Sequence, residues 1–162
     1  MTKPESKTAL KWMDAASALT KKEAVLRWME EMAAMTQPDK IVWITGEEEQ
    51  LEALRKQAVE EGILIKLNEY KLPGCYLHRT DPDDVARVED RTFICCEREE
   101  DAGPTNHWMD PKEMYEKMYA LADGAYKGRT MYVIPYSMSI IGSPFAKYGL
   151  SLIHISEPTR PY

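Results

Sequence analysis

Apolar side chains recur at helical spacing in three stretches of the chain, residues 20–37, 45–62 and 110–124. The first stretch opens on Thr20–Glu23, which has the pattern of a capping box. The third opens on Asp110–Pro111, an N-cap residue followed by the proline that suits a first helical position. Each stretch therefore predicts an amphipathic helix. In the third helix, the apolar positions that we expect to face the core are Met114, Tyr115, Met118 and Leu121.

Short apolar runs predict strands over residues 41–44, 63–67, 75–78, 92–96 and 131–138. The first run is wholly apolar, which is typical of a strand that is buried on both faces. Pro135 interrupts the last run and predicts an edge position or a bend. The polar stretch 97–106 contains a Gly-Pro pair and predicts an exposed loop. Because strands and helices alternate along the chain, the fold class that we predict is α/β.

A single arginine stands at the junction of two predicted elements. Asp81 and Pro82 predict a brief helix that ends at Arg87, just before the strand over 92–96. An arginine at such an element end can direct its planar, permanently charged guanidinium at a carboxylate or a phosphate. The alternative is a surface ion pair, usually worth under ~1 kcal/mol, with Asp83, Asp84 or Glu89. The residues alone leave both interpretations open.

Composition narrows the class of protein. The chain has 162 residues, of which 44% are hydrophobic and 30% are charged, as in soluble globular proteins. This length suits one ordinary domain or a piece of a larger one. A net charge of −6 argues against a nucleic-acid or anionic membrane surface, since either needs a basic face. No apolar run approaches the ~20 residues that span a bilayer. From the net charge and the lack of such a run, we expect no nucleic-acid partner and no membrane.

The cysteines and histidines do not form a metal-binding pattern. Cys75, Cys95 and Cys96 are odd in number and lack the spacing of metal ligands. Adjacent positions on a strand point to opposite faces, so we expect no bridge between Cys95 and Cys96. The three histidines are scattered, and residues 1–11 lack the apolar core of a signal peptide. This pattern favours reduced thiols in a cytoplasmic protein.

Two long blocks resemble one enzyme family, the GTP-dependent phosphoenolpyruvate carboxykinases. The first block is residues 80–95, with Asp-Val-Ala-Arg at 84–87. The second block is residues 127–138, with Gly-Ser-Pro at 142–144 behind it. The similarity runs from about residue 21 to about residue 150. It implies a truncated N-terminal domain of the carboxykinase fold, a mixed sheet with flanking helices.

The resemblance also implies an activity and one site residue. Similar proteins are carboxy-lyases that convert oxaloacetate and GTP to phosphoenolpyruvate, GDP and carbon dioxide in gluconeogenesis, with manganese and magnesium as metals. In this pattern the arginine at position 87 contacts the anionic oxaloacetate or phosphoenolpyruvate. The family's phosphate-binding loop, metal ligands and guanine pocket lie beyond the last residue of this sequence. The resemblance therefore implies substrate binding by Arg87 and no catalytic, cofactor-binding or metal-binding residue in this chain.

These inferences divide the chain into an arm over residues 1–19, a partial carboxykinase N-terminal domain over 20–149 and a tail over 150–162. The stretch from 150 to 160 resembles the translation of a transposon-end adapter used in sequencing libraries. That likeness implies a non-native tail, to be excluded from fold and function. We expect a monomeric fragment that is inactive by itself. The alternative is a small α/β binding or interaction module without catalysis.

Overall fold

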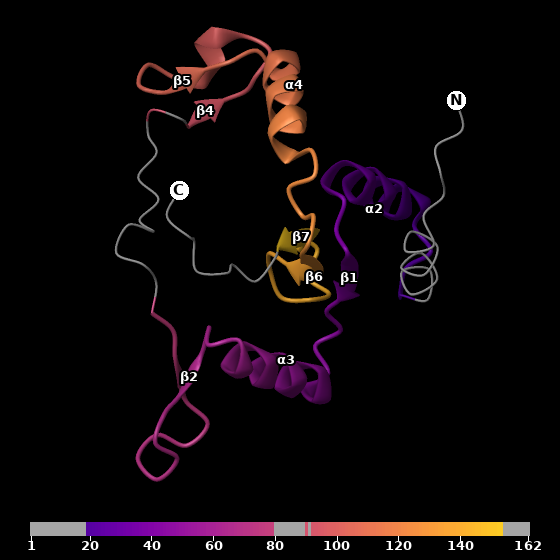
Figure 1. Cartoon of the computed structure of the whole chain (residues 1–162). Coiled ribbons are helices and arrows are strands. Elements are labelled where there is room, and N and C mark those ends of the chain that lie inside the picture. The colour runs from indigo at the N-terminus through magenta and orange to yellow at the C-terminus, as the bar shows by residue number, and fades with distance from the viewer. Residues whose placement is uncertain (1–18, 80–89, 91, 154–162) are drawn as a thin grey trace, which may run out of the picture. The chain divides into compact units, whose positions relative to one another are not determined.

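The computed structural model describes residues 19–79, 90 and 92–153 (Figure 1). The chain divides into two compact units. The first, which we call the helical unit, comprises residues 1–39 and 85–128. The second, which we call the sheet unit, comprises residues 40–84 and 129–162. Both units combine helices with strands, which confirms the α/β class.

A mixed sheet of three strands forms the centre of the sheet unit. It consists of β1 (Lys40–Trp43), β6 (Thr130–Ser137) and β7 (Tyr148–Ile153), in the order β1-β6-β7. β1 runs parallel to β6, whereas β7 runs antiparallel to it. The parallel pair is possible because the long connection between β1 and β6 carries the chain back to the end of the sheet at which β1 begins. The expectation of a mixed sheet is confirmed.

The core of the sheet unit is centred on β6. Met131 and Val133 are both 0% exposed, and Tyr132 between them is also buried. Pro135, which predicted an edge position or a bend, lies in a strand that pairs with both β1 and β7, so β6 as a whole is not an edge strand. β1 is only four residues long and pairs with Thr130–Val133. Pro135 therefore lies past the last pair with β1, where its missing N–H costs no hydrogen bond to that strand.

Helix α3 (Glu48–Glu60) confirms the second predicted helix. Its start is tied to the end of β1, because the Gln50 side chain donates to the carbonyl oxygen of Trp43 at 2.8 Å and accepts from the Thr45 amide at 2.8 Å. Its end is set by Gly62, which adopts a positive φ of 76° that a residue with a Cβ rarely takes. The amides of the next two residues then donate back to the Ala58 carbonyl.

A two-stranded hairpin follows α3 and confirms the next two predicted strands in shortened form. β2 (Ile65–Lys66) pairs antiparallel with β3 (Tyr76–Leu77). The connecting loop is held by the Asn68 side chain, whose oxygen accepts from two backbone amides. The Glu69 carboxylate accepts from Lys66 at 2.7 Å and from the Gly74 amide. The hydrogen bond from Lys66 is the main reason that the pKa of Glu69 is lowered.

The helical unit contains α2 (Glu23–Thr36) and α4 (Pro111–Ala122), which confirm the first and third predicted helices. The start of α4 is as predicted, since the Asp110 carboxylate accepts from the amides of Lys112 and Glu113. The capping box predicted for α2 is wrong. The N-cap residue is Lys22, and the Thr20 hydroxyl accepts only from the Lys22 amide, at 3.2 Å, before the helix begins.

The stretch 97–106, predicted as an exposed loop, has structure of its own. It contains the 3-10 helix η2 (Glu99–Ala102) and leads into β5 (His107–Trp108), which pairs parallel with β4 (Phe93–Ile94). Arg98 holds Asp101 with two hydrogen bonds, at 2.9 and 3.0 Å. The indole N–H of Trp108 donates to the Cys96 carbonyl at 2.9 Å. The loop prediction missed these elements because short polar sequences carry no periodic signal.

Two predictions concern residues outside the described part. The brief helix over 81–87 lies there, and so do residues 154–162 of the predicted non-native tail. β7 reaches Ile153 and thus includes residues 150–153. A strand with alternating apolar positions pairs with β6 whatever its origin, so the assignment of 150–162 stays a prediction.

Candidate functional site

Arg87, the one residue predicted to bind substrate, lies outside the described residues. The nearest described features on either side of it are a hydrogen bond of His78 and the strand β4. On one side, Nδ1 of His78 lies 2.8 Å from the Ile63 carbonyl oxygen. On the other, the strand β4 begins at Phe93. The role of Arg87 therefore rests on the sequence and on similarity to known proteins.

The described residues hold no group of three or more His, Cys, Asp or Glu side chains that could bind a metal ion. Over the same residues, no helix is both long and apolar enough to cross a membrane. All three cysteines are free, as predicted.

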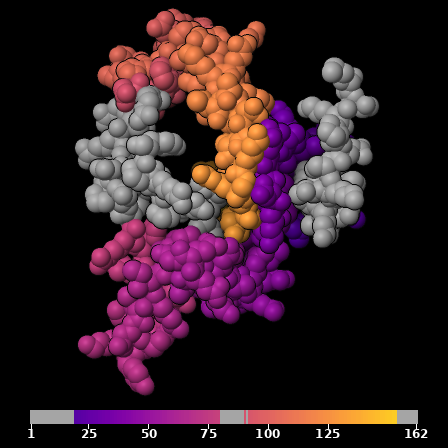
Figure 2. All heavy atoms as spheres, viewed as in Figure 1, coloured from indigo at the N-terminus to yellow at the C-terminus, as the bar shows by residue number. Residues whose placement is uncertain are grey.

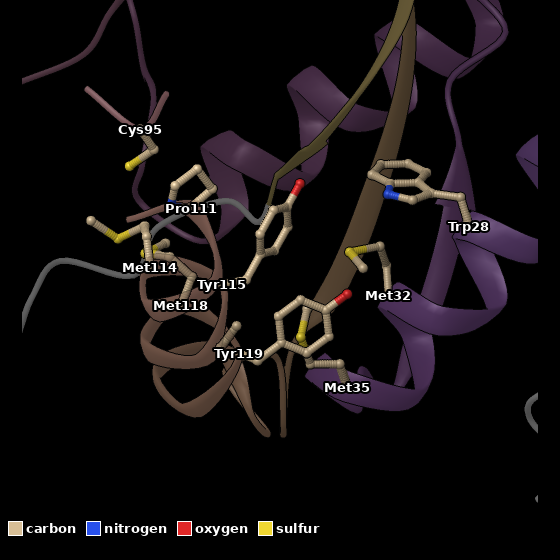
Figure 3. A pocket seen from close by; sticks show the side chains of 10 residues that line it. Trp28, Met32, Met35, Cys95, Pro111, Met114, Tyr115, Met118 and Tyr119 are labelled. Atoms are coloured by element: carbon tan, nitrogen blue, oxygen red, sulfur yellow. The ribbon is translucent and has the colours of Figure 1, made fainter. Parts of the chain in front are cut away.

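A cavity of about 470 Å³ lies within the helical unit, between α2 and α4 (Figure 3). Its walls consist almost entirely of apolar and aromatic side chains. The lining residues are Trp28, Met32, Met35, Cys95, Pro111, Met114, Tyr115, Met118, Tyr119 and Ala122.

Helical periodicity explains how each helix contributes to this cavity. Trp28, Met32 and Met35 follow one another at intervals of four and three residues, so they share one face of α2. On α4, Met114 and Met118 share a face in the same way. Figure 3 shows Tyr115 and Tyr119 of α4 between the two helices, opposite the α2 side chains, whereas Met114 and Met118 lie on the side of α4 next to Cys95. The sequence signal for these residues was their spacing in two separate helices, which cannot reveal that the two faces meet.

Hydrogen bonds fix the two helices to each other. The Tyr119 hydroxyl on α4 donates to the Glu31 carboxylate on α2. Just past the end of α4, the Gly124 amide donates to the Met35 carbonyl at 2.8 Å. The carbonyl oxygens at the end of α2 need such partners because no later turn of the helix supplies them. The cavity therefore lies between two elements whose separation is set by direct contacts.

One titratable group on the cavity wall has a shifted pKa. The hydrogen bond to the Glu31 carboxylate, with loss of hydration as a smaller cause, raises the pKa of Tyr119. The protonated phenol is the form that can donate, so the bond favours it. The cavity lining includes no Lys, Arg or His side chain. Its chemistry thus suits apolar groups, and it offers nothing that would hold the two carboxylates of oxaloacetate.

The prediction that α4 turns its apolar face to a core is wrong for the described structure. Met114, Tyr115 and Met118 line the cavity, but Leu121 does not, and α4 contains no buried residue. The physical reason is that α2 covers only part of the apolar face of α4. The rest of that face has no described element packed on it.

Comparison with known proteins identifies the family. The model of the phosphoenolpyruvate carboxykinase N-terminal domain matches residues 27–156, which include most of α2, all of α4, the central sheet and position 87. The chain belongs to the phosphoenolpyruvate carboxykinase family. The recognition made from residues 80–95 and 127–138 is thereby confirmed, and so is the assignment to the N-terminal domain of this fold.

Several relatives with the name phosphoenolpyruvate carboxykinase (GTP) are about half identical to this chain over the aligned residues. The protein of Anaeromyxobacter dehalogenans is 51% identical over 116 residues, which are 72% of this chain and 20% of the relative. The protein of Corynebacterium kroppenstedtii is 54% identical over 116 residues, 72% of this chain and 19% of the relative. The protein of Neocallimastix frontalis is 52% identical over 115 residues, 71% of this chain and 19% of the relative. The chain therefore spans about a fifth of the length of these carboxykinases.

Proposed function

We propose that this chain is the N-terminal part of a GTP-dependent phosphoenolpyruvate carboxykinase. The whole enzyme would convert oxaloacetate and GTP to phosphoenolpyruvate, GDP and carbon dioxide, in gluconeogenesis. The observation that carries this proposal is the match of residues 27–156 to the N-terminal domain of the family. About 50% identity to carboxykinases named for GTP supports the choice of nucleotide.

Within this proposal, Arg87 binds the anionic substrate. A guanidinium and a carboxylate or phosphate form two parallel hydrogen bonds, which fix the orientation of the substrate as well as its position. Support comes from the Asp-Val-Ala-Arg pattern at 84–87, which lies inside the matched residues. The competing interpretation, a surface ion pair with a neighbouring carboxylate, would contribute little to binding.

The remaining chemistry belongs to other parts of the enzyme. The resemblance assigns GTP and the divalent metals to residues outside this chain, and the metal would stabilise the enolate oxygen that develops on decarboxylation. The 162-residue polypeptide alone is accordingly expected to show no GTP-dependent turnover. Measurable carboxykinase activity of this polypeptide would contradict that expectation. We further propose a cytoplasmic, monomeric enzyme with small-molecule substrates.

Substitution of Arg87 in the full-length protein tests the proposal. Arg87→Ala removes a charged, two-pronged contact worth about 1.5–3 kcal/mol, so the KM for oxaloacetate should rise about 10- to 100-fold. Arg87→Lys keeps the charge but loses the planar fork, so it should restore only part of the affinity. Steady-state kinetics with oxaloacetate and with phosphoenolpyruvate measures both effects.

Arg98→Ala is the matched control. Arg98 is exposed and holds Asp101 and Glu100 in local surface ion pairs. Its loss should leave the KM for both substrates unchanged, because a surface pair contributes little to stability. An unchanged KM in Arg87→Ala, equal to that of Arg98→Ala, would return Arg87 to the surface-pair interpretation.

A further inference from the structure

Helix α4 exposes an apolar face that continues outward from the cavity. Tyr115 is 67% exposed, Met118 is 52% exposed and Leu121 is 76% exposed, although the three residues lie at helical spacing. In the space-filling view, the orange surface of α4 lies open on the side shown (Figure 2). Folded proteins rarely leave so many large apolar side chains of one helix in water without a partner. The face therefore indicates a contact that is not made within the described residues.

Contacts within the helical unit fix the position of the groove that this face forms with α2. The Asp110 cap starts α4, and the Tyr119–Glu31 hydrogen bond joins α4 to α2. Methionines contribute four of the ten lining residues. Methionine side chains are unbranched and polarisable, so they adapt to the shape of an incoming apolar group. The positions of the two helices are thus fixed, whereas the methionine side chains that line the groove can adapt.

The length of the relatives indicates what covers the groove. The chain spans about a fifth of each relative, and the matched domain is the N-terminal one of the family. About four fifths of such a protein then lies outside this chain. A segment on the same polypeptide meets the groove at a high effective concentration, which a separate partner does not have.

We propose that the groove between α2 and α4 is the docking surface for an apolar segment of the remainder of the same polypeptide. This inference rests on the proposed function only in taking the chain as part of a longer carboxykinase. The docked segment presents aliphatic or aromatic side chains, because the lining contains no charged side chain to pair with a charge. Docking buries Tyr115, Met118 and Leu121 and so attaches the helical unit to the rest of the enzyme.

Oxidative footprinting of the full-length protein tests the proposal directly. Hydroxyl radicals modify Tyr115 and Met118, and mass spectrometry gives each rate in the native protein relative to the unfolded protein. If the groove is covered, both relative rates should fall below about a tenth, since modification follows solvent exposure. If the groove is open, Tyr115 should retain about two thirds of its unfolded rate, in line with its exposure of 67%. That second result would overturn the proposal.

A matched pair of lysine substitutions in the full-length protein gives a second measurement. Leu121→Lys places a charge on the apolar face. Ala120→Lys places the same charge on the preceding residue of α4, which is also exposed. Leu121→Lys should raise the footprinting rate of Tyr115 at least about fivefold, because the charge opposes docking. Ala120→Lys should leave that rate unchanged. Equal rates in the two variants would contradict the proposal.

Other occupants give distinguishable outcomes, and each of them overturns the proposal. Protection of Tyr115 that disappears on dilution would assign the groove to a second copy of the protein. Protection that is lost when residues 1–18 are deleted would assign it to the beginning of this chain. The kinetics of the Arg87 variants are read separately. An active enzyme with an open groove would refute the docking alone, and a covered groove with an unchanged KM would refute the substrate role alone.

Discussion

Strand β6 and helix α4 are both rich in apolar residues, yet they differ in how far these residues are buried. β6 has three consecutive buried residues in its N-terminal half, including Met131 and Val133 with no exposure at all. α4 has no buried residue. β6 is the central strand of its sheet, with β1 paired to one edge and β7 to the other. Among the described residues, α2 lies against only part of α4, and Tyr115, Met118 and Leu121 stay largely exposed.

This difference separates two sources of order in the chain. β6 is held by burial, since each apolar side chain removed from water contributes to the stability of the sheet unit. α4 is held by its N-cap and by the hydrogen bond from the Gly124 amide, just past its end, to the Met35 carbonyl of α2. A helix that is held in this way can form while its apolar face is still exposed, and a partner can cover that face afterwards. The proposed docking of the remaining polypeptide is consistent with that difference.

The largest predicted effect comes from the same substitution in the two elements of the 162-residue chain. Met131→Ala in β6 should lower the free energy of unfolding by about 2–5 kcal/mol, because it leaves a cavity in a buried core. Met118→Ala in α4 should change it by no more than about 0.5 kcal/mol, because that side chain is half exposed. Urea unfolding followed by circular dichroism measures both values.

Repeating this pair in the full-length protein sharpens the comparison. If the remainder of the polypeptide covers α4, Met118→Ala becomes a core substitution and should cost about as much as Met131→Ala. A small effect of Met118→Ala in both proteins would show that the outer face of α4 stays exposed. Similar large effects of both substitutions in the short chain would contradict the contrast between β6 and α4.

An intermediate effect is expected at the start of α4. Asp110→Ala removes the carboxylate that accepts from two backbone amides, so it should destabilise the helical unit by about 1 kcal/mol. Thr20→Ala is the control, because Thr20 does not cap α2. Thermal unfolding of both variants should show a lower midpoint for Asp110→Ala alone. Equal midpoints would mean that the cap does not hold α4.

The smallest effect is a pH dependence at the contact between α4 and α2. The hydrogen bond to Glu31 raises the pKa of Tyr119, so the folded state favours the protonated phenol. Its contribution to stability is complete below the ordinary tyrosine pKa of about 10 and is lost as the pH rises through the raised pKa. Difference absorbance of tyrosinate between the protein and Tyr119→Phe measures this titration. In Glu31→Gln the pKa of Tyr119 should fall; an unchanged titration would show that the contact contributes nothing.

Local signals in the sequence were sufficient for the main elements. The three long helices were predicted because apolar spacing and flanking residues such as Asp110 and Gly62 act within a few residues. β1, β6 and the hairpin strands were predicted from short apolar runs. The failures concern pairing over longer distances. β5 is a two-residue strand that forms only because β4 lies beside it, and Thr20 fails as a cap because the helix starts three residues later.

The site divides in the same way. The sequence contained the Asp-Val-Ala-Arg pattern that led to the proposal for Arg87, because such a pattern is a property of a few adjacent residues. It also contained both apolar faces that line the cavity. It did not reveal that these faces meet each other, because spacing along one helix carries no information about the partner of that helix.

By itself, then, the sequence determined the α/β class, the helices and the family, since these depend on local pattern and residue identity. Only the tertiary structure decided that β6 is central in its sheet and that residues of α2 and α4 line one open apolar groove. It also showed that much of the apolar face of α4 remains open. The physical reason is that periodicity specifies which face of an element is apolar, whereas burial depends on which other elements are present to cover it.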